Sequence, residues 1–291
     1  MSEHDKEKDV DSETGVETTG HEWDGIKELN NPLPRWWLWT FYLTIAWGLW
    51  YVIAYPAWPL INGATAGYLG FSTRANVAAD IAAFDEKNAD LRAALTEVDL
   101  TKLEENEELS RFAVAGGRAV FLASCSQCHG SGAAGAKGYP NLLDDDWLWG
   151  GSIEDIAYTV NYGIRNEIDP DARWSEMPAF GEILEKEQID QVVQYVTSLS
   201  STDYDVELAA LGETVFGENC SACHGADGTG ERALGAPNLA DAIWLYGGDV
   251  GTLTETVTNA RFGVMPPWGT RLSPSEVNAV AAYVHQLGGG E

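Results

Sequence analysis

The sequence predicts a mainly α-helical protein, in which one N-terminal transmembrane helix is followed by two tandem copies of a small helical domain. Three observations predict this: a single long uncharged apolar run, an internal repeat near the C-terminus, and apolar residues at helical spacing within each copy. At 291 residues the chain has room for about two ordinary domains. The expected parts are a polar N-terminal segment 1–35, a transmembrane helix 36–56, a connecting segment 57–107, and domains at 108–200 and 205–291.

The apolar run is WWLWTFYLTIAWGLWYVIAY, residues 36–55, and it carries no charge. Twenty residues at about 1.5 Å each span about 30 Å, the thickness of a hydrocarbon core. Aromatic residues gather at both ends, as in interfacial belts, and Pro56 and Pro59 then end the helix. A buried core helix is the alternative, but no polar face marks a solvent side. Because about 35 mostly polar residues precede the run, and no small-residue cleavage site follows it, we expect an uncleaved membrane anchor.

The connecting segment begins with the Gly-containing stretch INGATAGYLGF and continues as ANVAADIAAFDEKNADLRAAL. The spacing of its apolar residues predicts a surface helix. We expect this segment to connect the membrane to the repeats and to have no chemistry of its own.

The repeat is specific. Gly117, Phe121 and the CxxCH of residues 125–129 recur 95 positions later as Gly212, Phe216 and the CxxCH of residues 220–224. Pro-Asn-Leu, an aromatic-rich stretch ending in Gly-Gly, Met-Pro and Tyr-Val also recur. The offset falls to 88 at the Met residues, so the first copy has extra residues, which we place in the loop NEIDPDARWSE. Each copy predicts a helix before CxxCH, a middle helix after Gly-Gly and a closing amphipathic helix, with no convincing strand.

The formal net charge of −28 excludes nucleic acid as an expected partner, because phosphate binding needs a basic face. An acidic surface can attract a cationic protein and speed its encounter. It can equally be a solvated surface or an adaptation to salt, and composition does not decide between these.

All four cysteines, Cys125, Cys128, Cys220 and Cys223, lie in the two CxxCH stretches. A thioredoxin-like disulfide site would accompany a βαβ pattern, and none is present. A zinc site needs four ligands, and each repeat has only one Cys pair. CxxCH is typical of covalent haem attachment: the two thiols form thioethers with the vinyl groups, and His129 or His224 then reaches the iron. We therefore expect two covalently bound haem c groups.

The opposite face of each iron needs a ligand as well. Apart from the initiator, the chain has only two methionines, Met177 and Met265, and they occupy equivalent positions in the repeats. A thioether favours ferrous iron and raises the reduction potential, so both are candidate axial ligands, with core packing as the alternative. The other histidines, His4, His21 and His285, are expected to be solvated. The sequence leaves open whether each Met serves its own repeat or the other; economy favours its own.

The segment WDGIKELNNPLPRWWLWTFYL, residues 23–43, together with one anchor and two CxxCH…MP units, resembles the dihaem cytochrome c subunit of cbb3-type cytochrome c oxidases, the CcoP or FixP family. The resemblance covers nearly the whole chain and implies two tandem class I cytochrome c domains. It implies haem attachment at Cys125, Cys128, Cys220 and Cys223, with His129, Met177, His224 and Met265 as axial iron ligands.

The resemblance also implies a function in respiration. The chain would be an electron-transfer subunit without its own substrate site, taking electrons from a donor cytochrome c and passing them to the monohaem subunit. The haem-copper subunit would then reduce oxygen. A bacterial inner membrane would hold the single span, with the N-terminus cytoplasmic and the haem domains periplasmic.

Two other classes of function remain as alternatives. A membrane-tethered dihaem peroxidase would need one iron with an open or displaceable ligand, whereas both repeats supply a Met. A haem sensor would need an output domain, and the sequence has no candidate for one.

Overall fold

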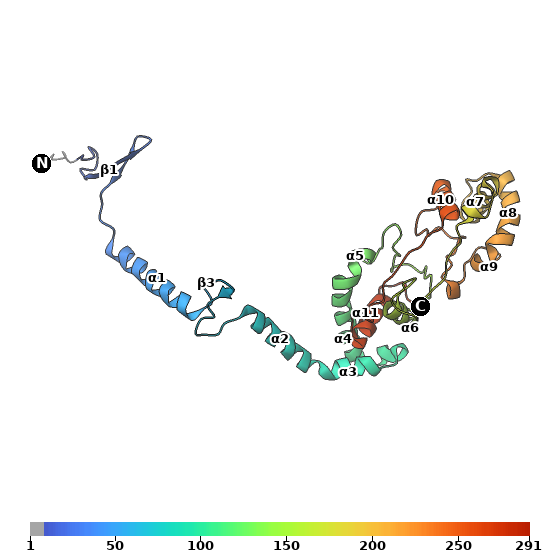
Figure 1. The fold of residues 1–291 in the computed structure, drawn as a ribbon, viewed down its shortest axis with the longest axis horizontal. Coiled ribbons are helices and arrows are strands. Elements are labelled where there is room, and N and C mark those ends of the chain that lie inside the picture. Colours follow the sequence, from blue (N-terminus) through green and yellow to red (C-terminus); the bar gives the residue numbers. More distant parts are fainter. Residues whose placement is uncertain (1–8) are drawn as a thin grey trace. The chain divides into compact units, whose positions relative to one another are not determined.

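The computed structural model describes residues 9–291 and divides at Asp85 into two compact units (Figure 1). The first unit contains the predicted membrane helix. The second, Glu86–Glu291, contains both repeats. His4 lies outside the described residues.

The first unit contains a small hairpin that we did not predict. Strands β1 (Thr18–Trp23) and β2 (Ile26–Leu29) pair in antiparallel register, with Trp23 opposite Ile26. The connecting residues Asp24 and Gly25 both have positive φ, 50° and 83°, as a two-residue hairpin turn requires. The Asp-Gly pair in the sequence is the signal that could have predicted this turn. A second, shorter hairpin pairs β3 (Pro59–Leu60) with β4 (Gly63–Ala64).

Helix α1 (Arg35–Ala54) is, among residues 9–291, the one helix long and apolar enough to cross a membrane. Its large side chains are exposed nearly all round; Trp36 and Trp39 are 70% and 69% exposed. The helix ends at Ala54 because Tyr55 is extended, as the residue before a proline prefers to be. Helix α1 therefore begins and ends within two residues of the predicted span of 36–56.

The connecting segment holds more structure than we expected. Its surface helix is present as α2 (Thr73–Lys87), followed by α3 (Ala89–Glu97) and the 3-10 helix η1 (Leu100–Glu105). However, Leu95 and Leu103 are buried against α4, α6 and α11 of the repeats. The Asn278 side chain donates a hydrogen bond of 2.8 Å to the Leu95 carbonyl. The second half of this segment is thus part of the second unit, Glu86–Glu291, which we call the haem unit because it contains both CxxCH motifs.

The helices of both repeats follow the predicted order. The first repeat contains α4 (Glu107–Val120), the π-helical turn η2 (Phe121–Cys125), α5 (Ser126–His129), α6 (Ile153–Tyr162), η3 (Phe180–Glu182) and α7 (Lys186–Ser200). The second contains α8 (Val206–Asn219), α9 (Ser221–His224), η4 (Arg232–Leu234), α10 (Val250–Asn259) and α11 (Pro274–His285). Side-chain caps start several of them: Asn106 for α4, Ser152 for α6, Asp205 for α8 and Asp249 for α10.

The hydrophobic cores do not follow the two repeats. What we call the first core joins Phe121, Ile156 and Val160 of the first repeat to the buried face of α11 in the second, Val277, Val280, Ala281 and Val284. The second core joins α7 of the first repeat to α8 and α10 of the second. Figure 1 shows α11 beside α4 and α6, and α7 beside both α8 and α10. Each of these two cores therefore contains residues of both repeats, and the predicted domains 108–200 and 205–291 are not separately packed.

The short connection between the repeats explains why the closing helix of each repeat packs against the other repeat, an arrangement that we call the exchange. Helix α7 ends at Ser200 and α8 begins at Val206, so the two form a helical hairpin and pack on each other along their length. Because α7 packs on α8, it does not cover α4 of its own repeat. Helix α11 of the second repeat covers α4 instead. The apolar stripe that we predicted on α11 faces this contact, and His285 lies off it. The His285 side chain is half-buried, with Nε2 3.0 Å from the Glu291 carbonyl oxygen, so it is less solvated than we expected.

Each exchanged helix pair touches at a glycine. A methyl group at Gly117 would lie 2.0 Å from the Ala279 carbonyl oxygen, and one at Gly212 would lie 2.0 Å from the Gln191 carbonyl oxygen. The neighbouring rings repeat as well: Phe121 meets Tyr283 at 5.5 Å and Phe216 meets Tyr195 at 5.1 Å between centroids. The same close crossing therefore holds both cores together.

We predict that Gly117→Ala destabilises the haem-loaded protein by about 1–3 kcal/mol, because the added methyl must push α4 away from α11. The matched control is Gly116→Ala in the same helix, where no atom lies within 4 Å and better helix propensity should add up to about 1 kcal/mol. Thermal unfolding followed by circular dichroism measures both. Equal effects of the two substitutions would contradict the exchanged packing.

Candidate haem sites

The two Cys pairs lie on single helical turns at the ends of α4 and α8. In each, the first thiol is half-buried against a core, Cys125 against the first and Cys220 against the second, while Cys128 and Cys223 are exposed. No disulfide joins any two of the four cysteines. Each turn thus presents one inner and one outer sulfur, and the histidine follows directly.

The histidine of each turn is held in one orientation. His129 Nδ1 lies 3.0 Å from the Pro140 carbonyl oxygen, and His224 Nδ1 lies 3.1 Å from that of Pro237. Since a carbonyl only accepts, each Nδ1 carries the proton and each Nε2 keeps its lone pair for a metal. Burial lowers the pKa of both histidines, which favours the neutral form that ligates iron. The repeated Pro-Asn-Leu is the sequence signal for this carbonyl contact, which we did not predict.

The thiols themselves do not suit redox exchange. Burial, and to a lesser extent the neighbouring Cys128 or Cys223, raises the pKa of the Cys125 and Cys220 thiols to about 11. A dithiol that exchanges disulfides needs a thiol pKa lowered below its ordinary value. Within residues 9–291 no group of three or more His, Cys, Asp or Glu side chains is placed to hold a metal ion, so a four-ligand zinc site is not assembled there.

The two methionines lie on loops that reach across to the other repeat. Met265 exchanges two backbone hydrogen bonds with Ile164, of 2.9 and 3.0 Å, and its side chain packs against the first core together with Cys125. Met177 lines a cleft of about 540 Å³ with residues 259–262, at the C-terminal end of α10. Each Met therefore lies at the end of the middle helix of the other repeat.

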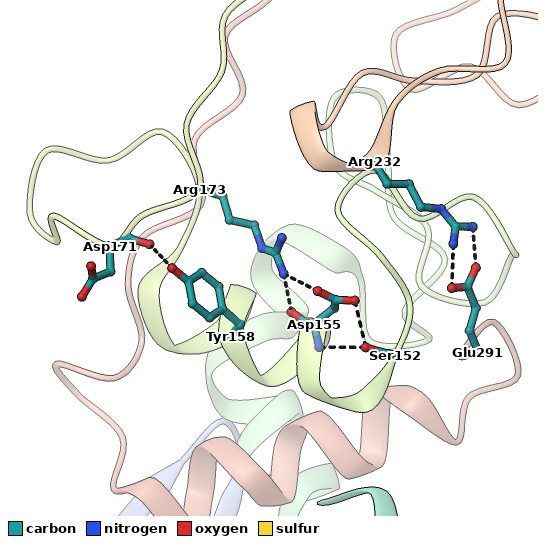
Figure 2. A network of polar contacts seen from close by, with 7 residues as sticks. All are labelled: Ser152, Asp155, Tyr158, Asp171, Arg173, Arg232 and Glu291. Atoms are coloured by element: carbon teal, nitrogen blue, oxygen red, sulfur yellow. Dashed lines mark hydrogen bonds and ion pairs between the residues drawn. The ribbon is translucent and has the colours of Figure 1, made fainter. Parts of the chain in front are cut away.

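A cluster of polar side chains lies near the start of α6 (Figure 2), and we did not predict it from the sequence. Arg173, from the loop with the extra residues, donates to Asp155 Oδ1 at 2.7 Å and lies over the Tyr158 ring and the Trp149 ring. Among residues 9–291, Trp149 Nε1 and Arg173 Nε are the buried side-chain nitrogens without a hydrogen-bond partner. Buried donors without an acceptor suit the propionate carboxylates of a haem, so the residues present fit this cofactor.

An acidic cleft of about 370 Å³ lies where the repeats meet, lined by residues 145–148, 229–232 and 236–243 in part. Arg232 at its edge is paired with Glu291 of the C-terminus (Figure 2). Burial, then the charges of Asp241 and Asp144, raises the pKa of Asp146 to about 6.

Two CxxCH turns with oriented histidines, two methionine loops and one membrane-length helix define a membrane-anchored dihaem c-type cytochrome. The chain matches the family described as the N-terminal domain of cytochrome oxidase-cbb3, FixP, over residues 15–62. It also matches cytochrome c oxidase, cbb3-type, subunit III, over residues 112–196 and 207–284. The chain belongs to this family of cbb3-type oxidase subunits, so the resemblance seen in the sequence is confirmed, and two covalently bound haem c groups follow.

Relatives are similar in sequence to this chain over almost its whole length. The chain is 62% identical to the cbb3-type cytochrome c oxidase subunit CcoP of Cereibacter sphaeroides, covering 94% of this chain and 95% of that protein. It is 50% identical to the FixP subunit of Sinorhizobium medicae, covering 99% of each chain. The FixP subunit of Azorhizobium caulinodans is 51% identical over 97% of this chain and 96% of its own.

We predict that Asp146→Asn stabilises the protein at pH 7.5 by about 1 kcal/mol, allowing for solvent screening of this half-buried group, and has no effect at pH 4. With its pKa raised from 3.8 to about 6, folded Asp146 binds a proton that the unfolded chain has lost, so stability falls as pH rises through that window. Thermal melts at both pH values measure this. Asp145→Asn, at the exposed neighbour, is the control; an equal gain in stability there would show that the effect does not depend on the burial of Asp146.

Proposed function

We propose that this chain is the electron-entry subunit of its oxidase complex: it accepts electrons from a donor cytochrome c and passes them to the monohaem subunit, after which the haem-copper subunit reduces oxygen. The observation that carries the proposal is the pair of equivalent sites, each with two anchoring thiols, a histidine fixed by a proline carbonyl, and a methionine loop. Membership of the cbb3 subunit III family supports the oxidase as the assembly.

In this proposal Cys125 and Cys128 hold one haem and Cys220 and Cys223 the other. His129 and His224 would bind iron through Nε2, and Met177 and Met265 would supply the second protein ligand of each iron. Each haem supplies a reversible one-electron couple. The carbonyls of Pro140 and Pro237 keep the imidazoles turned toward iron, and the thioether sulfurs favour the ferrous state that an electron carrier needs.

A His-Met pair at both irons favours electron transfer over the peroxidase alternative. With both axial positions taken by protein ligands, peroxide has no place to bind on iron. The chain would then have no substrate site of its own, and its reaction partners are other proteins. Its net charge of −28 supports a cationic donor, because charge complementarity speeds the encounter.

We predict that a cationic cytochrome c, reduced and mixed with membranes containing the complex, reduces the haems of this chain before oxygen is consumed. The rate should fall steeply between low and high salt, because screening removes the attraction. Stopped-flow absorption measures the order of events. Oxygen consumption while these haems stay oxidised, or peroxide turnover by the purified chain, would overturn the proposal.

For topology we propose a single pass through a bacterial inner membrane, with the N-terminus cytoplasmic and the haem unit periplasmic, where haem c is attached. The supporting observations are the position of α1 near the N-terminus and the two covalent attachment motifs after it.

We predict that a reporter active only in the periplasm works when fused after Glu291 and fails when fused before residue 1. Enzyme assays of intact cells measure both fusions, and a cytoplasm-specific reporter at the same two sites is the control. The opposite pattern would reverse the topology.

A further inference from the structure

We infer that each haem iron takes its histidine from one repeat and its methionine from the other: His129 pairs with Met265, and His224 pairs with Met177. This inference rests on the ligand set of the proposed function and adds to it the assignment of each Met to an iron. It replaces the expectation that each methionine serves its own repeat.

The Met265 loop follows the end of α6 closely. Besides the two hydrogen bonds with Ile164, the Trp268 amide donates to the Val160 carbonyl and the Gly269 amide to the Asn161 carbonyl, each at 3.0 Å. Helix α6 belongs to the first core, where Ile156 and Val160 pack with Phe121 and Cys125. Met265, Trp268 and Leu272 pack on the same core. The thioether of Met265 is therefore held on the core that contains the first Cys pair.

The Met177 loop has the equivalent place on α10. Just after Met177, Gly181 of η3 lies against Thr258, where an added methyl would come within 2.7 Å of Thr258 Cγ2. Helix α10 contributes Leu253 and Val257 to the second core, together with Phe216 and Cys220, and Leu184 packs there too. Met177 is thus held beside the core that contains the second Cys pair.

The two middle helices end with matching backbone at the point where each Met arrives. Gly163 after α6 has φ 75° and ψ −170°, and Ala260 after α10 has φ 60° and ψ 178°. A methyl at Gly163 would lie 2.4 Å from the Met265 carbonyl oxygen. An alanine in this glycine-favouring region shows that the second end keeps the same turn even without glycine. The two Met arrivals are therefore equivalent in structure as well as in sequence.

Arg165 links the two loops at their crossing. Its Nε donates to the Ser175 carbonyl at 2.6 Å and its Nη1 to the Gly263 carbonyl at 3.3 Å, and each acceptor lies two residues before a Met. The Trp174 ring also meets the Phe262 ring edge-on, with 6.0 Å between centroids. The two methionine loops therefore cross at one place, and these contacts hold each loop against the other repeat.

The test uses the intact dihaem chain with Met177→Leu or Met265→Leu, which keep apolar volume but remove the sulfur. Loss of a sixth ligand opens that iron to hydrogen peroxide, which bleaches the haem. After peroxide treatment and proteolysis, mass spectrometry of the two CxxCH peptides identifies which haem was lost. The controls are Met177→His and Met265→His, which restore a ligand and should protect both haems.

We expect Met177→Leu to lose the haem on the Cys220–Cys223 peptide and Met265→Leu to lose the haem on the Cys125–Cys128 peptide. The ferric Met-to-iron absorption band should fall by about half in each variant. Loss from the peptide of the same repeat would overturn the exchange and leave the proposed function standing. Protection of both haems in both variants would show that neither Met ligates iron, and the proposed ligand set would fail as well.

If a leucine variant accumulates poorly, the wild-type chain allows a second measurement. Proton NMR of the reduced protein gives each ligating Met methyl a strongly upfield-shifted signal. Contacts of that methyl across the haem to Phe121 or Phe216 then report the core in which it lies. We expect Met265 with Phe121; Met265 with Phe216 would overturn the inference.

Discussion

The close crossing of helices at Gly117 and Gly212 is the constraint on which the rest of the haem unit depends. At each crossing a glycine lets a carbonyl of the facing helix approach to where a methyl group would otherwise stand. That approach brings Tyr283 onto Phe121 and Tyr195 onto Phe216, and these rings close the cores that hold the first thiol of each CxxCH. Because the partners are α11 and α7, the same contacts that build each core also interlock the repeats. Small size makes such sharing useful, since a unit of under a hundred residues buries only a modest apolar area by itself.

The chemistry of each site is assembled from the same local parts. A helical turn supplies thiols and imidazole, a proline carbonyl one loop later fixes the imidazole proton on Nδ1, and a methionine arrives where a middle helix ends. None of these parts depends on the membrane helix, which is consistent with α1 and the haem unit being separate compact bodies. The anchor restricts where the electron carrier can diffuse, while the carrier's properties are decided within Glu86–Glu291.

The polar side chains where the repeats meet affect the protein in two different ways. Arg165 satisfies carbonyls of both methionine loops, and Arg173 covers Trp149 and Tyr158 while bound to Asp155. These arginines stiffen the region in which the propionates of a haem would find donors. Asp146 is different, because its carboxylate is half-buried among other acids and costs stability when ionised.

Sequence alone determined the cofactor and the anchor, because covalent haem attachment needs the CxxCH spacing and a membrane span needs about twenty uncharged residues. It offered the repeated Met as a candidate iron ligand, with core packing as the alternative. It also determined the order of helices, since each closing helix has its own apolar stripe. The Asp-Gly hairpin at residues 18–29 and the docking of Leu95 and Leu103 were not predicted, because short sequence signals are compatible with many alternative structures. Which closing helix packs on which partner was decided by tertiary structure. The two repeats carry the same glycine, aromatic and apolar pattern, so either pairing satisfies the sequence, and the short connection at residues 201–205 holds α7 against α8.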